Sequence, residues 1–519
     1  MRVFLSSAAV AILCVFPAVT MAQADPHTMK AIAKVDLRYQ SYNVEMVEVI
    51  GGRFWRPYSA TPIKDLPALE TLGVAGVDPN LFEQLPPADL TSPRLRKLAA
   101  ALGPAYIRVS GSWANTVYFQ DSDAPAPAKP PSGYAGVLTR AEWKGVIDFA
   151  KAVDAKIVTS FSVGEGARDA NGAWVPGQTE AFLRYTRQAG GSIAAAEFFN
   201  EPTIPAVAGV PASYDAAAYG RDFKTFVPIF RASAPGALLL GPSGTAEGSG
   251  SPSRMKVLPS EDLLKATGTG DLDVFSYHVY PAISERCAAR SPVKIGVSPD
   301  EALTIEFLRR TDNVEEFYAK LRDKAALGKP IWLSETGEAA CGGDRWASTY
   351  LDTFRYLYQL GTLATRNVQV VMHNTLAASD YALIDGRTLT PRPNYWAALL
   401  WHHLMGTTVL DAGAAPSQKL EIFAQCTAGQ PGKVTLLAIN LDKDHAQSLA
   451  LAEGSERYSL TSDELQERTV KLNGKTLMLT ADGDLPKIEG LATSLGPAAL
   501  APLSISFFVV NANNSMCKQ

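Results

Sequence analysis

The sequence predicts an α/β protein in which a (β/α)8 TIM barrel is combined with a C-terminal antiparallel β-sandwich domain. Through the middle of the chain, short apolar and β-branched runs alternate with longer amphipathic runs, the pattern of repeated βα units around a parallel sheet. From Gly406 onward, short alternating segments are separated by Gly, Asp and Asn, which is typical of antiparallel strands. These two patterns predict two domains, and 519 residues suffice for both.

Eight runs have the length and composition of barrel strands: Tyr42–Ile50, Ala105–Ser110, Lys156–Val163, Ile193–Asn200, Ala237–Pro242, Val274–Tyr280, Pro330–Glu335 and Val368–Asn374. Between them, apolar residues recur every three or four positions and predict helices over Thr139–Val153, Tyr214–Ala232, Asn313–Leu327 and Arg345–Leu360. Eight such units favour a closed barrel. The alternative is a doubly wound open sheet.

The domain boundaries follow from the last predicted helix of the barrel, Asn394–Leu404. We place the catalytic barrel at residues 25–404 and the β-sandwich at residues 405–519. The segment Ala31–Tyr39 could instead supply a strand to the sandwich, so the domains need not be separate in sequence. The Pro/Ala-rich run Asp123–Gly133 predicts an exposed loop on the face where such barrels carry their active sites.

The first 24 residues have the pattern of a signal peptide. One positive charge at Arg2 precedes the apolar stretch Ala8–Phe16, and the tripeptide AQA at residues 22–24 has the small residues of a signal-peptidase site. We therefore expect the mature protein to begin near Asp25 and to be exported, either periplasmic or secreted. The apolar stretch is too short to span a bilayer, and no later segment is long and apolar enough, so no membrane span is expected.

Composition argues against several kinds of partner. The chain has 48 Lys and Arg against 52 Asp and Glu, a net charge of −4, so it has no overall attraction for nucleic acid or a highly sulfated polyanion. No predicted strand is followed by a GxGxxG or GxxxxGK[ST] motif, and no cofactor is expected. The six histidines include no HExxH, and the neighbours His402 and His403 would point apart on a helix, so no metal site is expected.

Two carboxylates at strand ends indicate the chemistry. Glu201 ends the fourth predicted strand and Glu335 the seventh, and polar residues at the carboxyl ends of barrel strands project into one shared mouth. Glycoside hydrolysis requires two such groups, one protonated as acid and one ionised as nucleophile. Asn200 can donate a hydrogen bond to a sugar 2-hydroxyl. Glu338 is the rival nucleophile, but Glu335 directly follows the apolar core run of its strand.

The chain resembles glycoside hydrolase family 79, the family of heparanase, hyaluronidase and β-glucuronidases, over nearly all of its mature length. The stretches that carry the resemblance are AYIRVSGSWANTVYF, EFFNEPT, FSYHVYP, IWLSETGEAACGG, the block from SDYALIDG to MGTTVL and the Cys-bounded tail. The resemblance implies a retaining mechanism on β-linked glucuronic acid in an oligo- or polysaccharide. It gives Glu201 the role of acid/base, Glu335 that of nucleophile and Asn200 the 2-hydroxyl.

The same resemblance implies further substrate-binding residues. Tyr381 and the backbone amides of Gly342 and Gly343 would hold the uronate carboxylate, and donors of this kind can do so without a neutralising cation beside the nucleophile. His278 and Tyr280 would line the site. Two more positions complete the implied set of substrate-binding residues. The first is Glu45, with Glu48 as the alternative in another register. The second is Ser112, in a stretch where this chain has the sequence SGS and the family commonly has GGT.

Four cysteines remain after the leader, and they allow three pairings in an oxidising compartment. The Cys-bounded tail of the family favours Cys426–Cys517 within the sandwich. Cys287 and Cys341 follow the sixth and seventh strands, whose loops are neighbours, and we expect them to pair, with Cys341 as a free thiol the alternative.

Two questions of function stay open at this level. An endo-acting enzyme on a glycosaminoglycan and an exo-acting β-glucuronidase would share every catalytic residue named, and the loops Asp123–Gly133 and Ala282–Glu301 would distinguish them by shaping the cleft. The modest acidity of the chain argues against a heparan sulfate specialist, which needs basic flanks. The alternative class is a non-catalytic glycan-binding protein that has kept the fold.

Overall fold

The computed structural model describes residues 22–23, 25–58, 79–249, 256–268, 270–288, 296–325, 328–415, 417–451, 454–493 and 496–518. Of the leader predicted over residues 1–24, all but residues 22–23 lie outside the described residues, as does part of the loop Ala282–Glu301. Within the described ranges, no helix is long and apolar enough to cross a membrane.

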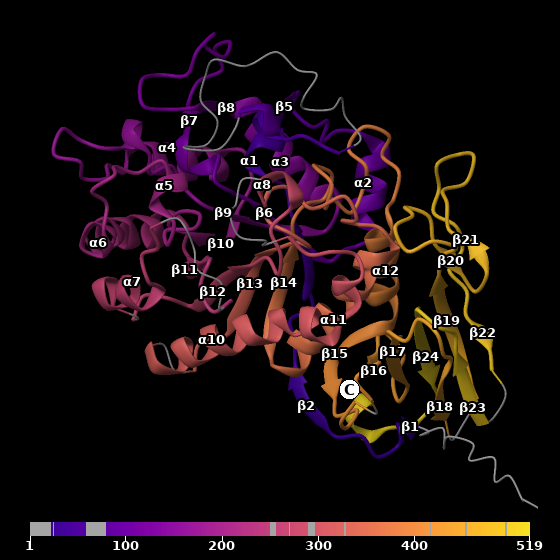
Figure 1. The fold of residues 1–519 in the computed structure, drawn as a ribbon. Coiled ribbons are helices and arrows are strands. Elements are labelled where there is room, and N and C mark those ends of the chain that lie inside the picture. The colour runs from indigo at the N-terminus through magenta and orange to yellow at the C-terminus, as the bar shows by residue number, and fades with distance from the viewer. Residues whose placement is uncertain are drawn as a thin grey trace, which may run out of the picture.

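Eight strands form a closed parallel barrel in sequence order, which confirms the predicted fold class (Figure 1). They are β3 (Gln40–Asn43), β6 (Ala105–Val109), β9 (Ala155–Thr159), β10 (Ile193–Glu197), β11 (Leu238–Gly244), β12 (Val274–Val279), β13 (Ile331–Thr336) and β14 (Val368–His373). Every neighbouring pair is parallel, and β3 closes the ring between β14 and β6. The alternative of an open doubly wound sheet is wrong.

The first predicted strand, Tyr42–Ile50, is only partly correct. The strand is Gln40–Asn43, and Met46–Ile50 forms the short helix α1. The β-branched residues of this segment favour a strand, but the N–H of Glu45 donates to Glu48 Oε2 at 2.7 Å, a contact that starts a helix. The fourth strand likewise ends at Glu197, so Asn200 and Glu201 lie just beyond it.

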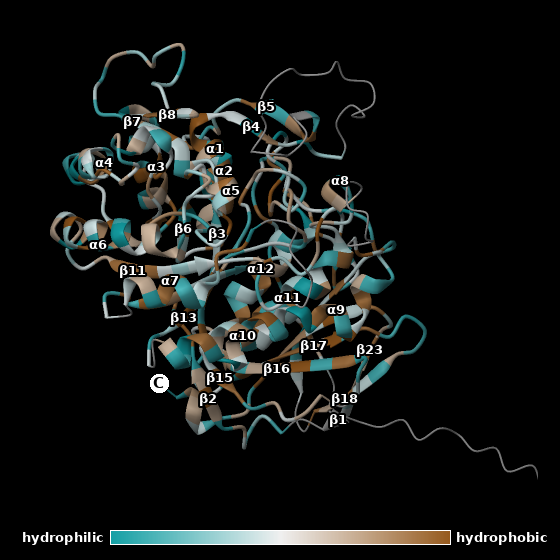
Figure 2. Cartoon of the chain, turned by 60° about the vertical axis from the view of Figure 1, so that its left-hand side comes forward, coloured by the Kyte–Doolittle hydropathy of each residue, from teal (hydrophilic) through white to brown (hydrophobic). Residues whose placement is uncertain are grey.

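The barrel helices are amphipathic and pack their apolar faces on the strands. In α3 (Arg140–Ala152), the residues Trp143, Val146, Ile147 and Ala150 are buried at spacings of three and four, and Thr139 caps the N-terminus through the N–H of Glu142. Figure 2 shows hydrophilic and hydrophobic segments side by side on α4, α6 and α10. The other helices are α2 (Pro93–Ala100), α4 (Gly177–Gln188), α5 (Pro205–Ala208), α6 (Ala216–Ser233), α7 (Ser260–Thr267), α8 (Glu285–Ala288), α9 (Ile305–Leu308), α10 (Arg310–Ala325), α11 (Tyr350–Thr365) and α12 (Pro393–Leu404).

Two small paired elements extend from the barrel. The hairpin β4 (Gly52–Trp55) and β5 (Phe82–Leu85) is antiparallel, and β7 (Val117–Gln120) pairs with β8 (Gly136–Thr139) in parallel. The run 123–133 connects β7 to β8 and is largely exposed. Short 3₁₀ turns are η2 (Pro79–Leu81), η3 (Ala114–Thr116), η4 (Glu165–Ala167), η5 (Glu301–Leu303) and η6 (Ser515–Cys517).

The C-terminal region forms the predicted antiparallel domain, seen at the lower right of Figure 1. Its larger sheet follows the order β2-β15-β16-β17-β24-β19-β20-β21, with β22 paired to β19, and its smaller sheet the order β1-β18-β23. The strands are β1 (Ala22–Gln23), β2 (Ala31–Lys34), β15 (Met405–Leu410), β16 (Leu420–Thr427), β17 (Val434–Asn440), β18 (Gln447–Leu451), β19 (Ser455–Thr461), β20 (Lys471–Leu472), β21 (Lys475–Thr476), β22 (Leu491–Ala492), β23 (Gly496–Leu500) and β24 (Ser504–Val510).

Two elements join the domains. The segment β2, which precedes the first barrel strand, pairs antiparallel with β15 in the larger sheet. Helix α11 is buried on all sides, as expected of a helix enclosed between two layers. The hydroxyl of Tyr350 on this helix donates to the carbonyls of Leu460 and Leu503 in the sandwich, at 2.8 and 2.9 Å. The barrel and the sandwich therefore share one continuous core.

Two disulfides are present, Cys287–Cys341 and Cys426–Cys517. They are the two pairs expected from the sequence. The first joins the loops that follow β12 and β13, and the second ties β16 to η6 at the end of the chain. Disulfides of this kind form in oxidising compartments.

Candidate active site

Glu201 and Glu335 come together at the mouth of the barrel. Glu335 lies within β13 and Glu201 just past β10, where its φ of 52° is in the left-handed region, an uncommon conformation for a side chain of this size. One carboxylate oxygen of each and a ring nitrogen of His278 all lie within 4.8 Å of one another. His278 Nδ1 is 3.1 Å from Glu201 Oε1. The site is therefore a close pair of carboxylates with an imidazole between them.

Arg108 organises this pair from β6 and is completely buried. Its Nη1 donates to Glu335 Oε2 at 2.7 Å, its Nε and Nη2 bind the two oxygens of Glu197 at 2.8 and 3.0 Å, and Nη2 also donates to Asn200 Oδ1 at 2.6 Å. The hydroxyl of Tyr280 donates to the other oxygen of Glu335 at 2.7 Å. Glu335 thus accepts from a guanidinium and a phenol, donors that stabilise an ionised carboxylate.

The pKa values of Glu201 and Glu197 are shifted in opposite directions. Burial raises the pKa of Glu201, and the charge of Glu335 adds to that effect against the hydrogen bond from His278. Burial alone would raise the pKa of Glu197, but the charge of Arg108 and hydrogen bonds from His278 and Arg108 bring it down to about 2. The raised pKa favours the protonated form of Glu201, which an acid requires, and the lowered pKa of Glu197 favours its ionised form beside Arg108.

The surroundings of His278 favour its protonated form. Burial would lower its pKa, but the charge of Glu335 and hydrogen bonds with Glu197 and Glu201 raise it to about 9 despite the opposing charge of Arg108. Glu201, His278 and Glu335 are close enough to ligate a metal ion. We refer to Glu201, Glu335, Arg108, Glu197 and His278 as the carboxylate end of the site.

The other side of the site is built from tyrosines and glycines. Asn374 Nδ2 donates to the hydroxyls of Tyr280 and Tyr381, at 3.0 and 3.1 Å, and the two rings are stacked with centroids 6.5 Å apart. Burial raises the pKa of both phenols well above the usual value, so both stay protonated donors. We call this side the tyrosine end. It consists of Tyr381, Asn374, Gly342 and the segments that hold them.

Gly342 and Gly343 adopt positive φ values of 84° and 82° after β13. A Cβ at Gly342 would collide with Trp55 and Ser379, so only glycine fits this turn. The N–H of Gly343 already donates to the carbonyl of Ala339 at 3.1 Å. The N–H of Gly342 makes no hydrogen bond with the described residues, so it is the better donor for a ligand.

Glu45, rather than Glu48, lies near Glu335 and Arg108. Burial raises the pKa of Glu45, and the charge of Glu335 raises it further, which places the two carboxyl groups near each other. Glu48 accepts the N–H of Glu45 and so serves the start of α1. Ser112 is half-buried in the turn after β6. Glu338 is buried and accepts the N–H of Asp344 at 2.8 Å, so it supports the loop after β13.

Sequence reasoning missed Arg108, Glu197 and Asn374. A signal was present for the first two, because a charged residue in the apolar run AYIRV and another between AAA and FF have to be paired once buried. Asn374 ends the predicted eighth strand, and the general rule that barrel strands end in functional side chains applies to it as well.

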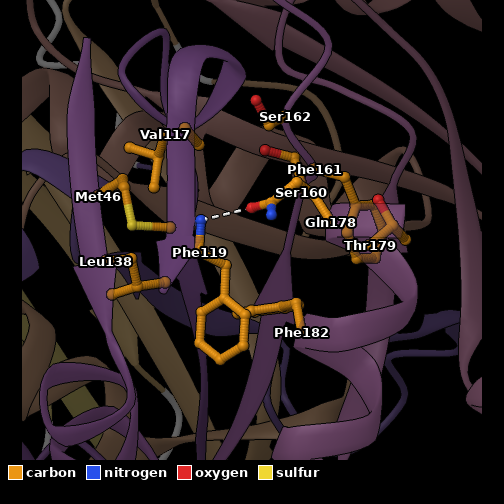
Figure 3. A pocket seen from close by; sticks show the side chains of 11 residues that line it. Met46, Val117, Phe119, Leu138, Ser160, Phe161, Ser162, Gln178, Thr179 and Phe182 are labelled. Atoms are coloured by element: carbon orange, nitrogen blue, oxygen red, sulfur yellow. Dashed lines mark hydrogen bonds between the residues drawn. The ribbon is translucent and has the colours of Figure 1, made fainter. Parts of the chain in front are cut away.

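The cavity in Figure 3 lies apart from these groups. It has a volume of about 30 Å³ and is lined mainly by apolar side chains of α4, β7 and β8, among them Phe119, Leu138 and Phe182. Gln178 closes one side by accepting the N–H of Phe119 at 2.7 Å. A space of this size holds one or two water molecules, not a sugar.

The model of glycosyl hydrolase family 79, N-terminal domain, matches residues 84–361, more than half of the chain. The chain belongs to this family. Membership of a glycoside hydrolase family makes a carbohydrate its expected type of substrate. The match contains Glu201, Glu335, Arg108, Asn200 and His278.

Similar proteins cover most of the chain. Heparanase-like protein 1 of Arabidopsis thaliana is 29% identical over 83% of this chain and 86% of its own length. Hyaluronoglucuronidase of Hirudo nipponia is 26% identical over 83% of this chain and 92% of its own. The solved structure of a 4-O-α-L-rhamnosyl-β-D-glucuronidase from Fusarium oxysporum superposes with a TM-score of 0.63 at 13% identity, covering 94% of this chain and all of that one, and it supports the fold.

Proposed function

We propose that the protein is a retaining β-glucuronidase-type glycosidase that cleaves β-linked glucuronic acid. The observation that carries the retaining mechanism is the separation within 4.8 Å of one oxygen each of Glu201 and Glu335. Retaining glycosidases have carboxyl groups about 5 to 5.5 Å apart, whereas inverting enzymes need about 6.5 to 9.5 Å to admit a water molecule.

In this mechanism Glu335 attacks the anomeric carbon while Glu201 protonates the departing oxygen, and a covalent glycosyl-enzyme forms. Glu201 then takes a proton from a water molecule that attacks the same carbon and releases Glu335. The raised pKa of Glu201 supports the first step, and the donors Arg108 and Tyr280 support the ionised nucleophile. Asn200, whose Oδ1 is fixed by Arg108, would offer its amide to the sugar 2-hydroxyl.

The glucuronide preference rests on the tyrosine end and on relatives. Tyr381 and the N–H of Gly342 would donate to the uronate carboxylate, while His278, Glu45 and Ser112 would line the sugar site. Hyaluronoglucuronidase of Hirudo nipponia and the 4-O-α-L-rhamnosyl-β-D-glucuronidase of Fusarium oxysporum are glucuronidases by name. We further propose that the chain is exported by its leader, since both disulfides suit an oxidising compartment.

The test is hydrolysis of a chromogenic β-D-glucuronide beside the matching β-D-glucoside, with hyaluronan and heparan oligosaccharides as further substrates. We expect release from the glucuronide with a β-configured first product by NMR. An α-configured first product would contradict the retaining mechanism, and no turnover of any of the four would favour a non-catalytic glycan-binding protein. Product sizes from the polymers would distinguish endo from exo action.

A further inference from the structure

Asn115 lies in the loop after β6, is completely buried and binds the backbone of Asn200 at two points. Its Oδ1 accepts the N–H of Asn200 and its Nδ2 donates to the carbonyl of Asn200, both at 3.0 Å. The N–H belongs to the peptide unit before Asn200, and the carbonyl belongs to the unit after it, which also carries the nitrogen of Glu201. Because both peptide units are planar, the amide of Asn115 fixes the direction in which the chain enters Glu201.

Asn115 is itself held by three hydrogen bonds from the loop after β9. Its carbonyl accepts the N–H of Val163 and that of Gly164, both at 2.8 Å, and the hydroxyl of Ser162 at 3.1 Å. A side chain that is buried, paired at both ends and anchored through its own backbone can hold a neighbouring group in a narrow range of positions. Asn115 therefore connects the loops that follow β6, β9 and β10.

The backbone at Glu201 needs support of this kind. Its φ of 52° lies in the left-handed region, which a side chain of this size occupies only where the surrounding structure determines it. After Glu201, its carbonyl accepts the N–H of Ile204 at 3.0 Å, and Thr203 exchanges two hydrogen bonds with Thr245, at 2.9 and 3.1 Å. Before Glu201, the pair between Asn115 and Asn200 supplies the restraint.

The side chain of Asn200 is held as well, because Arg108 Nη2 donates to its Oδ1 at 2.6 Å. Asn200 is thus fixed at three points, two on its backbone by Asn115 and one on its side chain by Arg108. Arg108 is charged and also binds Glu335, so its replacement would change the electrostatics of the site. Asn115 is neutral, and its replacement tests the geometry of Asn200 and Glu201 while every charge stays in place.

We propose that Asn115 is a positioning residue that holds Glu201 where it can protonate the departing oxygen. This inference rests on the proposed function, because it takes Glu201 as the acid/base. A general acid has to lie within hydrogen-bond reach of the atom that it protonates, and a misplacement of about 1 Å by a distant change can cost about 10²-fold in rate. Asn115 prevents that misplacement by fixing the peptide unit that precedes Glu201.

The test is Asn115→Leu, which keeps a branched side chain of similar size and removes both hydrogen bonds to Asn200. We expect kcat/KM on methyl β-D-glucuronide, whose leaving group needs a proton, to fall about thirty- to a hundredfold. On dinitrophenyl β-D-glucuronide, whose leaving group needs none, the fall should stay below about fivefold. Both values of kcat/KM report the step that forms the glycosyl-enzyme, so their ratio measures the protonation by Glu201.

Asn440→Leu is the matched control. Asn440 is equally buried but lies in the sandwich, where its Oδ1 accepts the N–H of Asp442 at 3.0 Å and its Nδ2 donates to the carbonyl of Ala501 at 2.8 Å. Both Leu variants leave buried backbone groups unpaired and should have lower melting temperatures. Only Asn115→Leu should change the ratio between the two glucuronides.

Equal losses on both glucuronides in Asn115→Leu would show a merely structural role and overturn the inference, as would unchanged kinetics. Asn115→Ala, which cannot overpack the site, provides a second variant with the same split expected. Amide hydrogen exchange of the wild type adds a measurement that needs no variant: the N–H of Asn200 should exchange as slowly as those within β10, and rapid exchange would contradict the restraint by Asn115. A wild type that hydrolyses no glucuronide would contradict the proposed function and this inference together, whereas an active wild type without the split in Asn115→Leu would contradict only the inference.

Discussion

In the carboxylate end, the charged side chains come from within barrel strands or just past them: Arg108 from β6, Glu197 from β10, His278 from β12 and Glu335 from β13. In the tyrosine end, Tyr381 and Gly342 come from loops. The disulfide Cys287–Cys341 ties the loop of Gly342 to the short helix α8, and Arg468 of the sandwich pairs with Asp380 beside Tyr381 in sequence. Under the proposed function, the chemistry, which tolerates little misplacement, is built on the rigid strands. Substrate recognition would then fall to loops, which need separate cross-links to keep their shape.

Among substitutions in the carboxylate end, Glu335→Gln should cause the largest loss of activity. The amide keeps the size of the side chain but cannot attack the anomeric carbon, so kcat on a β-glucuronide should fall by at least about 10⁴-fold. Turnover is measured with a chromogenic glucuronide, and circular dichroism checks that the fold survives. Turnover retained at a tenth of the wild-type rate would assign the nucleophile to another carboxylate.

Glu201→Ala should remove the acid/base function from the carboxylate end and leave the nucleophile Glu335 in place. Cleavage of a dinitrophenyl glucuronide, whose leaving group needs no proton, should continue slowly, whereas a poor leaving group should be lost by about 10²- to 10⁴-fold. Azide should accelerate the variant by entering the vacated space and attacking the glycosyl-enzyme. Equal losses for good and poor leaving groups would contradict the acid role of Glu201.

Tyr381→Phe tests the tyrosine end without touching the carboxylates. Losing a donor to a charged group costs about 1.5 to 3 kcal/mol, so kcat/KM on the glucuronide should fall roughly ten- to a hundredfold. The matching glucoside should be hardly affected, because it offers no carboxylate. If the glucuronide rate were untouched, the carboxylate would be bound elsewhere in the site.

Loss of the two disulfides should have different effects, because only Cys287–Cys341 lies at the tyrosine end. Reduction of Cys287–Cys341 should release the Gly342 turn and raise KM several-fold before the melting temperature falls. Reduction of Cys426–Cys517, which closes a separation of 91 residues, should lower the melting temperature first, by the loss of about 4 to 5 kcal/mol in the chain-entropy account. Paired Cys→Ser variants, assayed for kinetics and thermal unfolding, measure both. The reverse order of effects would contradict this division.

The barrel was predictable because its periodicity is local. Apolar runs of five or six residues and helices such as Arg140–Ala152 are visible in sequence, and so are the paired glutamates at strand ends. The helix Met46–Ile50 was not, since its β-branched residues favour a strand and only the contact between Glu45 and Glu48 decides otherwise. The contact between Arg468 and Asp380 depends on where a second domain packs, and no local pattern encodes that.

The pairing of β2 with β15 constrains how the chain can be made and divided. The edge of the larger sheet is supplied by residues 31–34, yet its partner strand is residues 405–410. During synthesis, β2 can pair with β15 only after the whole barrel sequence has emerged. The larger sheet is therefore completed at a late stage. A fragment starting at residue 405 would lack β2 and leave β15 with unpaired backbone groups, which are prone to pair with another copy. We therefore expect the sandwich expressed alone to associate, and addition of a peptide containing residues 25–39 to return it to a monomer.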